Sequence, residues 1–178
     1  MHRPLHWVLV AAGAASVPAL ATQYLTAEQS QTVMFPEATA FRRQDIALST
    51  PQMQQVEKLA GISSRSVNWR VVAALKGEQL IGYVVLDDVV GKFELISYAV
   101  GLNLDASVRQ VEILTYRESH GGEIRNPAWR RQFVGRRAQG GIAVGEGVAN
   151  ISGATLSCTH VTDGVRRIAA IAQVVLAK

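Results

Sequence analysis

The chain has 178 residues, 48% of them hydrophobic, which suffices for one compact domain with a substantial core but not for two. Its 18 Lys and Arg against 14 Asp and Glu give a net charge of +4, too weakly basic to indicate a nucleic-acid partner. The single cysteine, Cys158, excludes an intrachain disulfide and a cysteine-based zinc site.

Residues 1–21 have the pattern of a secretory signal peptide. Arg3 lies in a short basic n-region, and an apolar core runs from Trp7 to Val17. The segment Ala19-Leu20-Ala21 matches an A-x-A cleavage site. The apolar run is shorter than a membrane span requires. We therefore expect cleavage near Thr22, a mature chain with 17 basic and 14 acidic residues, and a periplasmic or otherwise extracytoplasmic location.

Residues 22–65 form an N-terminal segment with one clear helix. The pattern predicts this helix over 51–60, with Thr50 as its cap, Pro51 in its first turn and Gly61 as its stop. Weaker patterns predict a short helix before Phe35 and a strand over 45–48.

Four strands are predicted next, joined by short turns rich in Gly, Asn and Asp. Hairpin-length connections favour antiparallel pairing, so the strands should form a meander. In the last strand Val111 and Ile113 share one face while Glu112 and Leu114 share the other, which indicates one packed and one partly wet face. The predicted strands are 67–75, 80–86, 93–102 and 108–116.

The segment 117–147 combines a polar loop, a short helix and a glycine-rich tract. Asn126 can cap the helix, and Trp129 shares one of its faces with Phe133, which favours a core position for both rings. A carboxylate pair formed by Glu118 and Glu123 could be an acid/base pair, but nothing else in the sequence supports hydrolysis. A cluster of arginines is either a solvated face or a contact for a phosphate or an acidic partner, and it contains Arg125, Arg130, Arg131, Arg136 and Arg137.

A long amphipathic helix ends the chain. Its apolar positions have helical spacing and are Cys158, Val161, Val165, Ile168, Ala172 and Val175. This stripe favours a buried, inert Cys158 over a reactive one. We expect Arg166 and Arg167 on the opposite side, with Asp163 paired to Arg167.

The start of this helix is a run of small residues, Ile151-Ser152-Gly153-Ala154-Thr155-Leu156-Ser157. We expect Ser157 to cap the helix and Thr155 to lie just outside the first turn. Free backbone N–H groups and the helix dipole favour an anion there, above all a phosphate. From the pattern alone, both an ordinary cap and a phosphate site with an esterifiable hydroxyl remain open.

Several motifs, in order, resemble the FMN-binding domain family of the flavin-carrying subunits of the sodium-pumping NADH:quinone reductase and the Rnf complex. The segment Ser152-Gly153-Ala154-Thr155 resembles the S-G-A-T flavinylation motif, and Glu118-Ser119-His120-Gly121 stands where the family usually has E-T-P-G. Trp129 with Gln132-Phe133 matches a W..QF signature. The remaining matches are Gly82-Tyr83-Val84 and the hairpin from Val100-Gly101-Leu102-Asn103 to Val111-Glu112-Ile113-Leu114.

The resemblance implies that residues 66–178 are an FMN-binding domain in which Thr155 carries FMN as a phosphoester. A separate magnesium-dependent flavin transferase would attach it from FAD. Ser152, Gly153, Ala154, Leu156 and Ser157 would then surround the attachment point, and Glu118, Ser119, His120 and Gly121 would lie beside the flavin ring.

The loop departs from the family pattern at Ser119-His120, because proline fixes the backbone and histidine does not. His120 is either a flavin donor or proton relay, or a solvent-exposed loop residue.

The sequence thus predicts an α+β domain, an antiparallel strand meander packed against the C-terminal amphipathic helix. The predicted function is that of an exported electron-transfer flavoprotein, a redox carrier more than an autonomous enzyme, with a membrane-associated redox donor or acceptor. The alternatives are a module that holds FMN or another phosphoryl ligand without a covalent bond, and a non-redox domain that binds a protein partner.

Overall fold

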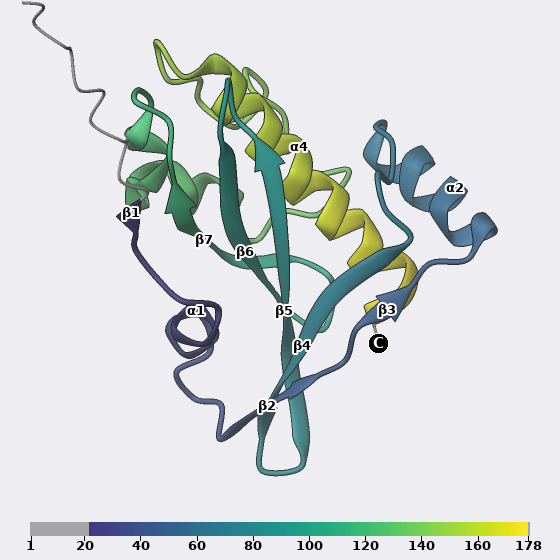
Figure 1. Ribbon diagram of the computed structural model, residues 1–178. Coiled ribbons are helices and arrows are strands. Elements are labelled where there is room, and N and C mark those ends of the chain that lie inside the picture. Colours follow the sequence, from purple (N-terminus) through teal and green to yellow (C-terminus); the bar gives the residue numbers. More distant parts are fainter. Residues whose placement is uncertain (1–21, 178) are drawn as a thin grey trace, which may run out of the picture.

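The computed structural model describes residues 22–177, and the predicted signal peptide at 1–21 lies outside them. It has the expected α+β architecture, in which an antiparallel sheet carries a long C-terminal helix on one face (Figure 1). Within the described residues, none of the helices is long and apolar enough to span a membrane.

The centre of the sheet is the predicted meander. Strands β4 (Asn68–Lys76), β5 (Gln79–Val90), β6 (Leu95–Leu102) and β7 (Val108–Tyr116) pair consecutively and antiparallel. The bounds of β7 are those predicted, whereas β5 continues four residues beyond its predicted end. It does so because its last residues pair with the start of β6, up to Val90 opposite Leu95.

The N-terminal segment supplies both edges of the same sheet. Strand β1 (Thr22–Gln23) pairs with β7, and β2 (Ala40–Arg43) and β3 (Ile46–Ala47) both pair with β4. The strand order is β1-β7-β6-β5-β4-β2. Strand β3 lies within the predicted range, but β1 and β2 were not predicted, because such short edge strands carry no alternating apolar pattern.

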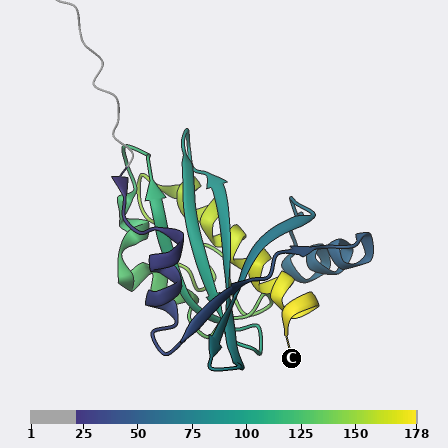
Figure 2. The same cartoon turned by 60° about the horizontal axis from the view of Figure 1, so that its bottom comes forward.

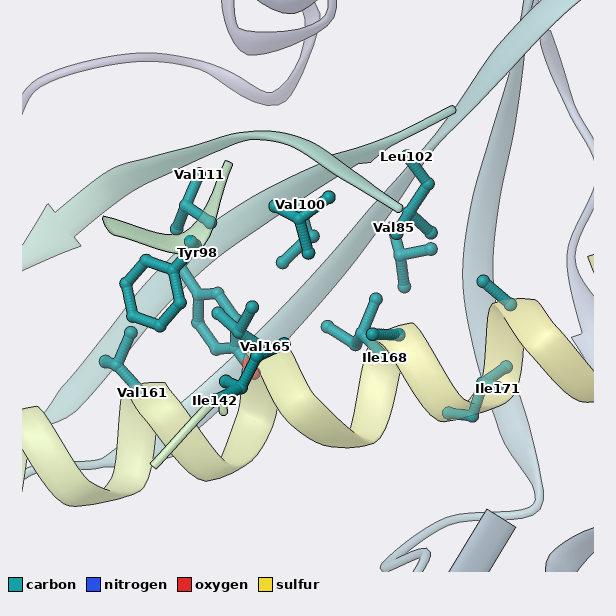
Figure 3. Close-up of a cluster of buried hydrophobic side chains, with 14 of the residues drawn as sticks. Val85, Tyr98, Val100, Leu102, Val111, Ile142, Val161, Val165, Ile168 and Ile171 are labelled. Atoms are coloured by element: carbon teal, nitrogen blue, oxygen red, sulfur yellow. The ribbon is translucent and has the colours of Figure 1, made fainter. Parts of the chain in front are cut away.

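Helix α4 (Thr155–Ile171) lies across one face of the sheet and continues as a π-helical turn, η3 (Ala172–Leu176). The predicted apolar stripe is buried from Cys158 to Ala172, and only its last member, Val175, is partly exposed. Figure 3 shows the stripe facing side chains from three strands, and the core shown there includes Val85, Tyr98, Val100, Leu102, Val111, Val161, Val165 and Ile168.

Helix α1 (Ala27–Met34) covers part of the opposite face, as Figure 2 shows. Met34 and Phe35 pack there on a second cluster that contains Ala74, Val84, Ala99 and Leu114. The prediction of a partly wet face is therefore wrong for much of β7, because residues far away in the sequence cover it.

Helix α2 (Thr50–Ala60) agrees with the predicted helix and ends at Gly61 in the left-handed conformation. Its cap is Ser49 and not Thr50, because the Ser49 side chain accepts the N–H of Gln52 while the Gln52 side chain accepts the N–H of Ser49. The helix packs beside the C-terminal half of α4 (Figure 1).

This packing overturns the prediction for the polar side of α4. Arg167 is buried, at 6% exposure, and its Nε donates to the carbonyl of Ser63 at 2.6 Å. Asp163 pairs with Arg166 at 2.8 Å and not with Arg167. The periodicity of one helix does not reveal which loop packs against its outer side.

The segment after β7 contains three short turns, η1 (Gly122–Arg125), α3 (Pro127–Arg130) and η2 (Arg131–Phe133). Asn126 caps α3 by accepting the N–H of Ala128, as predicted. Trp129 and Phe133 are buried edge to face, with ring centroids 5.1 Å apart, which confirms their predicted core position.

Most of the arginine cluster is structural. Arg130 forms an ion pair with the buried Glu112 and donates to the carbonyl of Val111 at 2.8 Å. Arg136 reaches carbonyls of the glycine-rich tract at Gly140, Gly141 and Gly147. One interpretation of the sequence was that these arginines form a solvated face. Most of them instead donate to partners within the chain, because the folded loop presents many backbone carbonyls.

We predict that Gly164→Ala lowers the free energy of unfolding by up to about 2 kcal/mol. A Cβ at Gly164 would overlap the Tyr98 hydroxyl, which donates to Asp87 at 2.6 Å. Overpacking costs about 1–3 kcal/mol, and the better helix propensity of alanine offsets about 1 kcal/mol of it. Urea denaturation measures the loss.

The control is the same substitution in a Tyr98→Phe background, where the overlapping hydroxyl is absent. The penalty should be smaller there. An equal penalty in both backgrounds would contradict the proposed contact.

Candidate functional site

A cleft of about 450 Å³ lies where the start of α4 meets the loop after β7 and the β5–β6 hairpin. Its size is in the range of cofactor pockets, about 300–1,000 Å³. It is lined by Lys92, Phe93, Glu118, Ser119, His120, Gly153, Ala154, Thr155, Leu156 and Ser157. Two motifs about thirty residues apart in the sequence thus share one cavity, together with a hairpin that the sequence did not single out.

The two motifs are joined by direct packing. Gly121 has a φ of 84°, and a Cβ on it would overlap the Cβ of Ala154. The hydroxyl of Tyr116 donates to the carbonyl of His120 and lies 3.4 Å from the Ser157 Oγ. Tyr116, the last residue of β7, therefore holds the polar loop against the first turn of α4, and burial raises the pKa of its hydroxyl.

Helix α4 begins at Thr155, with Ala154 as its cap residue. The predictions that Ser157 caps the helix and that Thr155 lies outside it are wrong. The Ser157 side chain is instead buried beside Tyr116, because the helix starts at Thr155, three residues earlier than a cap at Ser157 requires. In the described structure no side chain caps this end, so first-turn N–H groups remain without an intrahelical partner.

Thr155 presents its hydroxyl at the cleft. The residue is exposed, and its Oγ1 accepts a hydrogen bond from the Asn150 Nδ2 at 3.3 Å. Gly153 precedes it with a φ of 79°, and a Cβ added to this glycine would meet no atom within 4 Å, so the approach is open. The arrangement leaves a nucleophilic hydroxyl beside backbone donors.

The W..QF residues hold the chain that leads into this turn. The indole Nε1 of Trp129 donates to the carbonyl of Ala149 at 2.7 Å, and the N–H of Ala149 donates to the Gln132 Oε1 at 2.8 Å. Sequence reasoning placed Trp129 only in the core. The backbone N–H and C=O of Ala149 are therefore both hydrogen-bonded. Because Ala149 lies six residues before Thr155, these bonds position the turn.

Glu118 binds the β5–β6 hairpin. Its Oε1 accepts the N–H groups of Phe93 at 2.6 Å and Glu94 at 3.0 Å, and a Cβ on Gly91 would come within 2.5 Å of the same oxygen. Burial acts to raise the pKa of this carboxyl, but these backbone donors outweigh it, and the net shift is below the ordinary value of 4.5. The carboxylate thus shapes one wall of the cleft.

Phe93 and Lys92 are the lining residues that sequence reasoning missed. Phe93 is 75% exposed, the highest value among the large apolar side chains of residues 22–177, and the Lys92 Nζ lies 4.9 Å from its ring centroid. Leu156, 47% exposed, adds a second apolar side chain to the lining. The sequence feature that could have identified Phe93 is an aromatic residue within a polar turn, Gly91-Lys92-Phe93-Glu94.

The other predicted residues divide between the cleft and its surroundings. Ser119 and His120 line it and contact each other, with Oγ and Nδ1 3.0 Å apart, whereas Ser152 and Gly121 do not line it. Glu123 does not line the cleft and borders an adjoining surface hollow, which shares Ser119 and His120 with it.

Neither a thiol nor a metal centre is part of the cleft lining. Cys158 is fully buried, as expected, and burial raises the pKa of its thiol. Residues 22–177 contain no group of three or more His, Cys, Asp or Glu side chains arranged to hold a metal ion.

The fold and cleft therefore define a small α+β protein with an uncapped helix start and an exposed threonine in a cofactor-sized cavity. Residues 91–170 match the model of the FMN-binding domain family. The match contains the whole cleft lining, from Lys92 to Ser157.

A solved structure also aligns with much of the chain. It is a crystal structure of NqrC from Shewanella oneidensis, which aligns with a TM-score of 0.46 and 16% identity, over 77% of this chain and 79% of that chain. No curated protein sequence matches the chain significantly.

The cleft residues fit FMN. A phosphate at the α4 start would meet uncapped backbone N–H groups and the positive end of a 17-residue helix. Phe93 and Leu156 offer apolar surface for a ring, and Ser119 and His120 offer polar groups. The residues that line the cleft thus lie within the range that matches the family model.

We predict that Glu118→Gln lowers stability at neutral pH and that the difference from wild type shrinks in acid. Because the folded pKa lies below the ordinary value, the carboxylate stabilises the fold above about pH 4.5. This contribution is lost as the pH falls through the lowered folded pKa. Thermal melts of both proteins from pH 7 to pH 3 measure the difference.

Amide hydrogen exchange at Phe93 and Glu94 provides a local readout, since both N–H groups lose a charged acceptor in the variant. Exchange should accelerate there. A melting difference that stays constant with pH would contradict the role assigned to Glu118.

Proposed function

We propose that the protein is an exported electron-transfer flavoprotein that carries FMN as a phosphoester on Thr155. The observation that supports this most is the exposed Thr155 hydroxyl at the uncapped start of α4, inside the cleft of an FMN-binding domain. When bound, FMN supplies redox chemistry through its isoalloxazine ring.

The attachment step is a phosphoryl transfer to the protein. The Thr155 Oγ1 forms a bond to the FMN phosphorus of FAD, the pyrophosphate bond of FAD breaks, AMP leaves, and the hydroxyl proton is released. A separate magnesium-dependent flavin transferase would catalyse the step. The open approach past Gly153 leaves room for that enzyme at the exposed hydroxyl.

After attachment, the residues of this chain hold the cofactor and set its surroundings. The first-turn N–H groups of α4 would bind the phosphate oxygens, and the Asn150 Nδ2 orients the Thr155 oxygen. Phe93 and Leu156 would shield the ring from water on the side of the hairpin. The open cleft suits electron exchange with a larger partner, which we propose is a membrane-associated donor or acceptor.

Export is a further part of the proposal and rests on the signal-peptide pattern of residues 1–21. A covalent link is useful outside the cytoplasm, because a dissociated flavin would be lost to dilution.

We predict that Thr155→Val abolishes covalent flavin and leaves the fold nearly unchanged, because the side chain is exposed. The protein is coexpressed with a flavin transferase, and intact mass reports the addition of one FMN less one water. The matched control is Thr159→Val, one turn further along α4, which should retain the full addition.

Covalent flavin retained by Thr155→Val would assign the attachment to another residue. Flavin released on denaturation of the wild type, without a mass increase, would replace the phosphoester by non-covalent binding in the same cleft.

A further inference from the structure

A second pocket, of about 250 Å³, lies further along α4, where the helix meets the end of β5 and the loop before β4. It is lined by Arg65, Val89, Val90, His160, Asp163 and Arg167. The three α4 residues are spaced by three and four, so they share one helix face. From Thr155 to Arg167 the helix rises roughly 18 Å, which separates this pocket from the proposed flavin attachment.

Arg167 is a buried arginine that forms no ion pair among the described residues. Only its Nε forms a hydrogen bond, to the carbonyl of Ser63, and its buried Nη1 has no partner among the described residues. Buried charges are normally paired, because an unpaired one loses its hydration without compensation. Burial lowers the pKa of the Arg167 guanidinium and the positive charge of Arg65 adds to the effect, whereas the negative charges of Asp87 and Asp163 oppose it without reversing it.

Arg65 brings a second guanidinium to the same pocket. Its two terminal nitrogens make only long contacts, of 3.4 Å, to the carbonyl of Asp88, and within residues 22–177 it forms no ion pair. Its φ of 62° is in the left-handed region that side chains other than glycine rarely adopt. The loop is therefore held in an unfavourable conformation that brings the side chain to the pocket.

The acidic groups nearby form no ion pair with Arg65 or Arg167. Asp163, which lines the pocket, pairs with Arg166 at 2.8 Å, and Asp87, which accepts the Tyr98 hydroxyl at 2.6 Å, does not line the pocket. The His160 Nδ1 donates to the carbonyl of Val90 at 2.5 Å. Two guanidinium groups thus face a small cavity with one carboxylate that is paired elsewhere.

We propose that this pocket binds a small oxyanion, a carboxylate or phosphate group, between Arg65 and Arg167. Guanidinium groups bind both kinds of anion through paired N–H donors, and such an anion supplies the ion-pair partner that neither arginine has among the described residues. The site depends neither on FMN nor on Thr155. It borders the hairpin whose tip lines the flavin cleft, since Val89 and Val90 belong to one pocket and Lys92 and Phe93 to the other.

Isothermal titration calorimetry of the flavin-free protein with sodium phosphate and with sodium succinate, at constant ionic strength, tests the proposal. We expect saturable binding that Arg65→Ala weakens about tenfold or more, the loss typical of a charged hydrogen bond. Arg65 is exposed, so this variant should fold normally. Tighter binding of phosphate or of succinate identifies the preferred anion.

The matched control is Arg70→Ala, which removes the same charge from a nearby exposed arginine that is paired with Asp88 at 2.9 Å. Its affinity should stay within about twofold of wild type, because exposed charges act weakly at a distance. Absence of saturable binding of both anions, or equal affinity in Arg65→Ala, would overturn the proposal. Equal affinity would also reveal binding elsewhere, such as the start of α4.

Discussion

The position of α4 on the sheet is the constraint on which the rest of the structure depends. The helix approaches β6 so closely at Gly164 that the Tyr98 hydroxyl occupies the space of a side chain. This contact, with the apolar stripe on either side of it, fixes how the helix lies on the sheet. The cleft exists because the start of the helix meets two other parts of the chain.

Three contacts build the cleft around the helix start. Gly121 packs on Ala154, Glu118 binds the β5–β6 hairpin, and Trp129 with Gln132 fixes the backbone before Thr155. None of them engages the Thr155 hydroxyl, whose oxygen accepts a hydrogen bond only from Asn150 among the described residues. A side chain at the usual cap position would satisfy the helix start, whereas Ala154 leaves its donors available for a phosphate.

The arginines show how packing assigns different roles to one residue type. Arg130 and Arg136 are bound to a carboxylate and to backbone carbonyls, so their positive charges serve the fold. Arg65 and Arg167 have no such acidic partner among residues 22–177, and they converge on a second pocket. We therefore expect an external anion where guanidinium groups lack an ion-pair partner within the chain. The number of arginines in a stretch of sequence does not indicate such a place.

The sequence by itself determined the strand meander, the apolar stripe of α4 and the motif that contains Thr155, because these depend on local periodicity and residue type. It failed for Ser157 and Arg167, whose surroundings come from Tyr116 and from the loop after α2. It also missed Phe93, since nothing local connects a hairpin tip with a helix start sixty residues later. Only the tertiary structure decided which polar groups are capped, paired or left free, because their partners are distant in the chain.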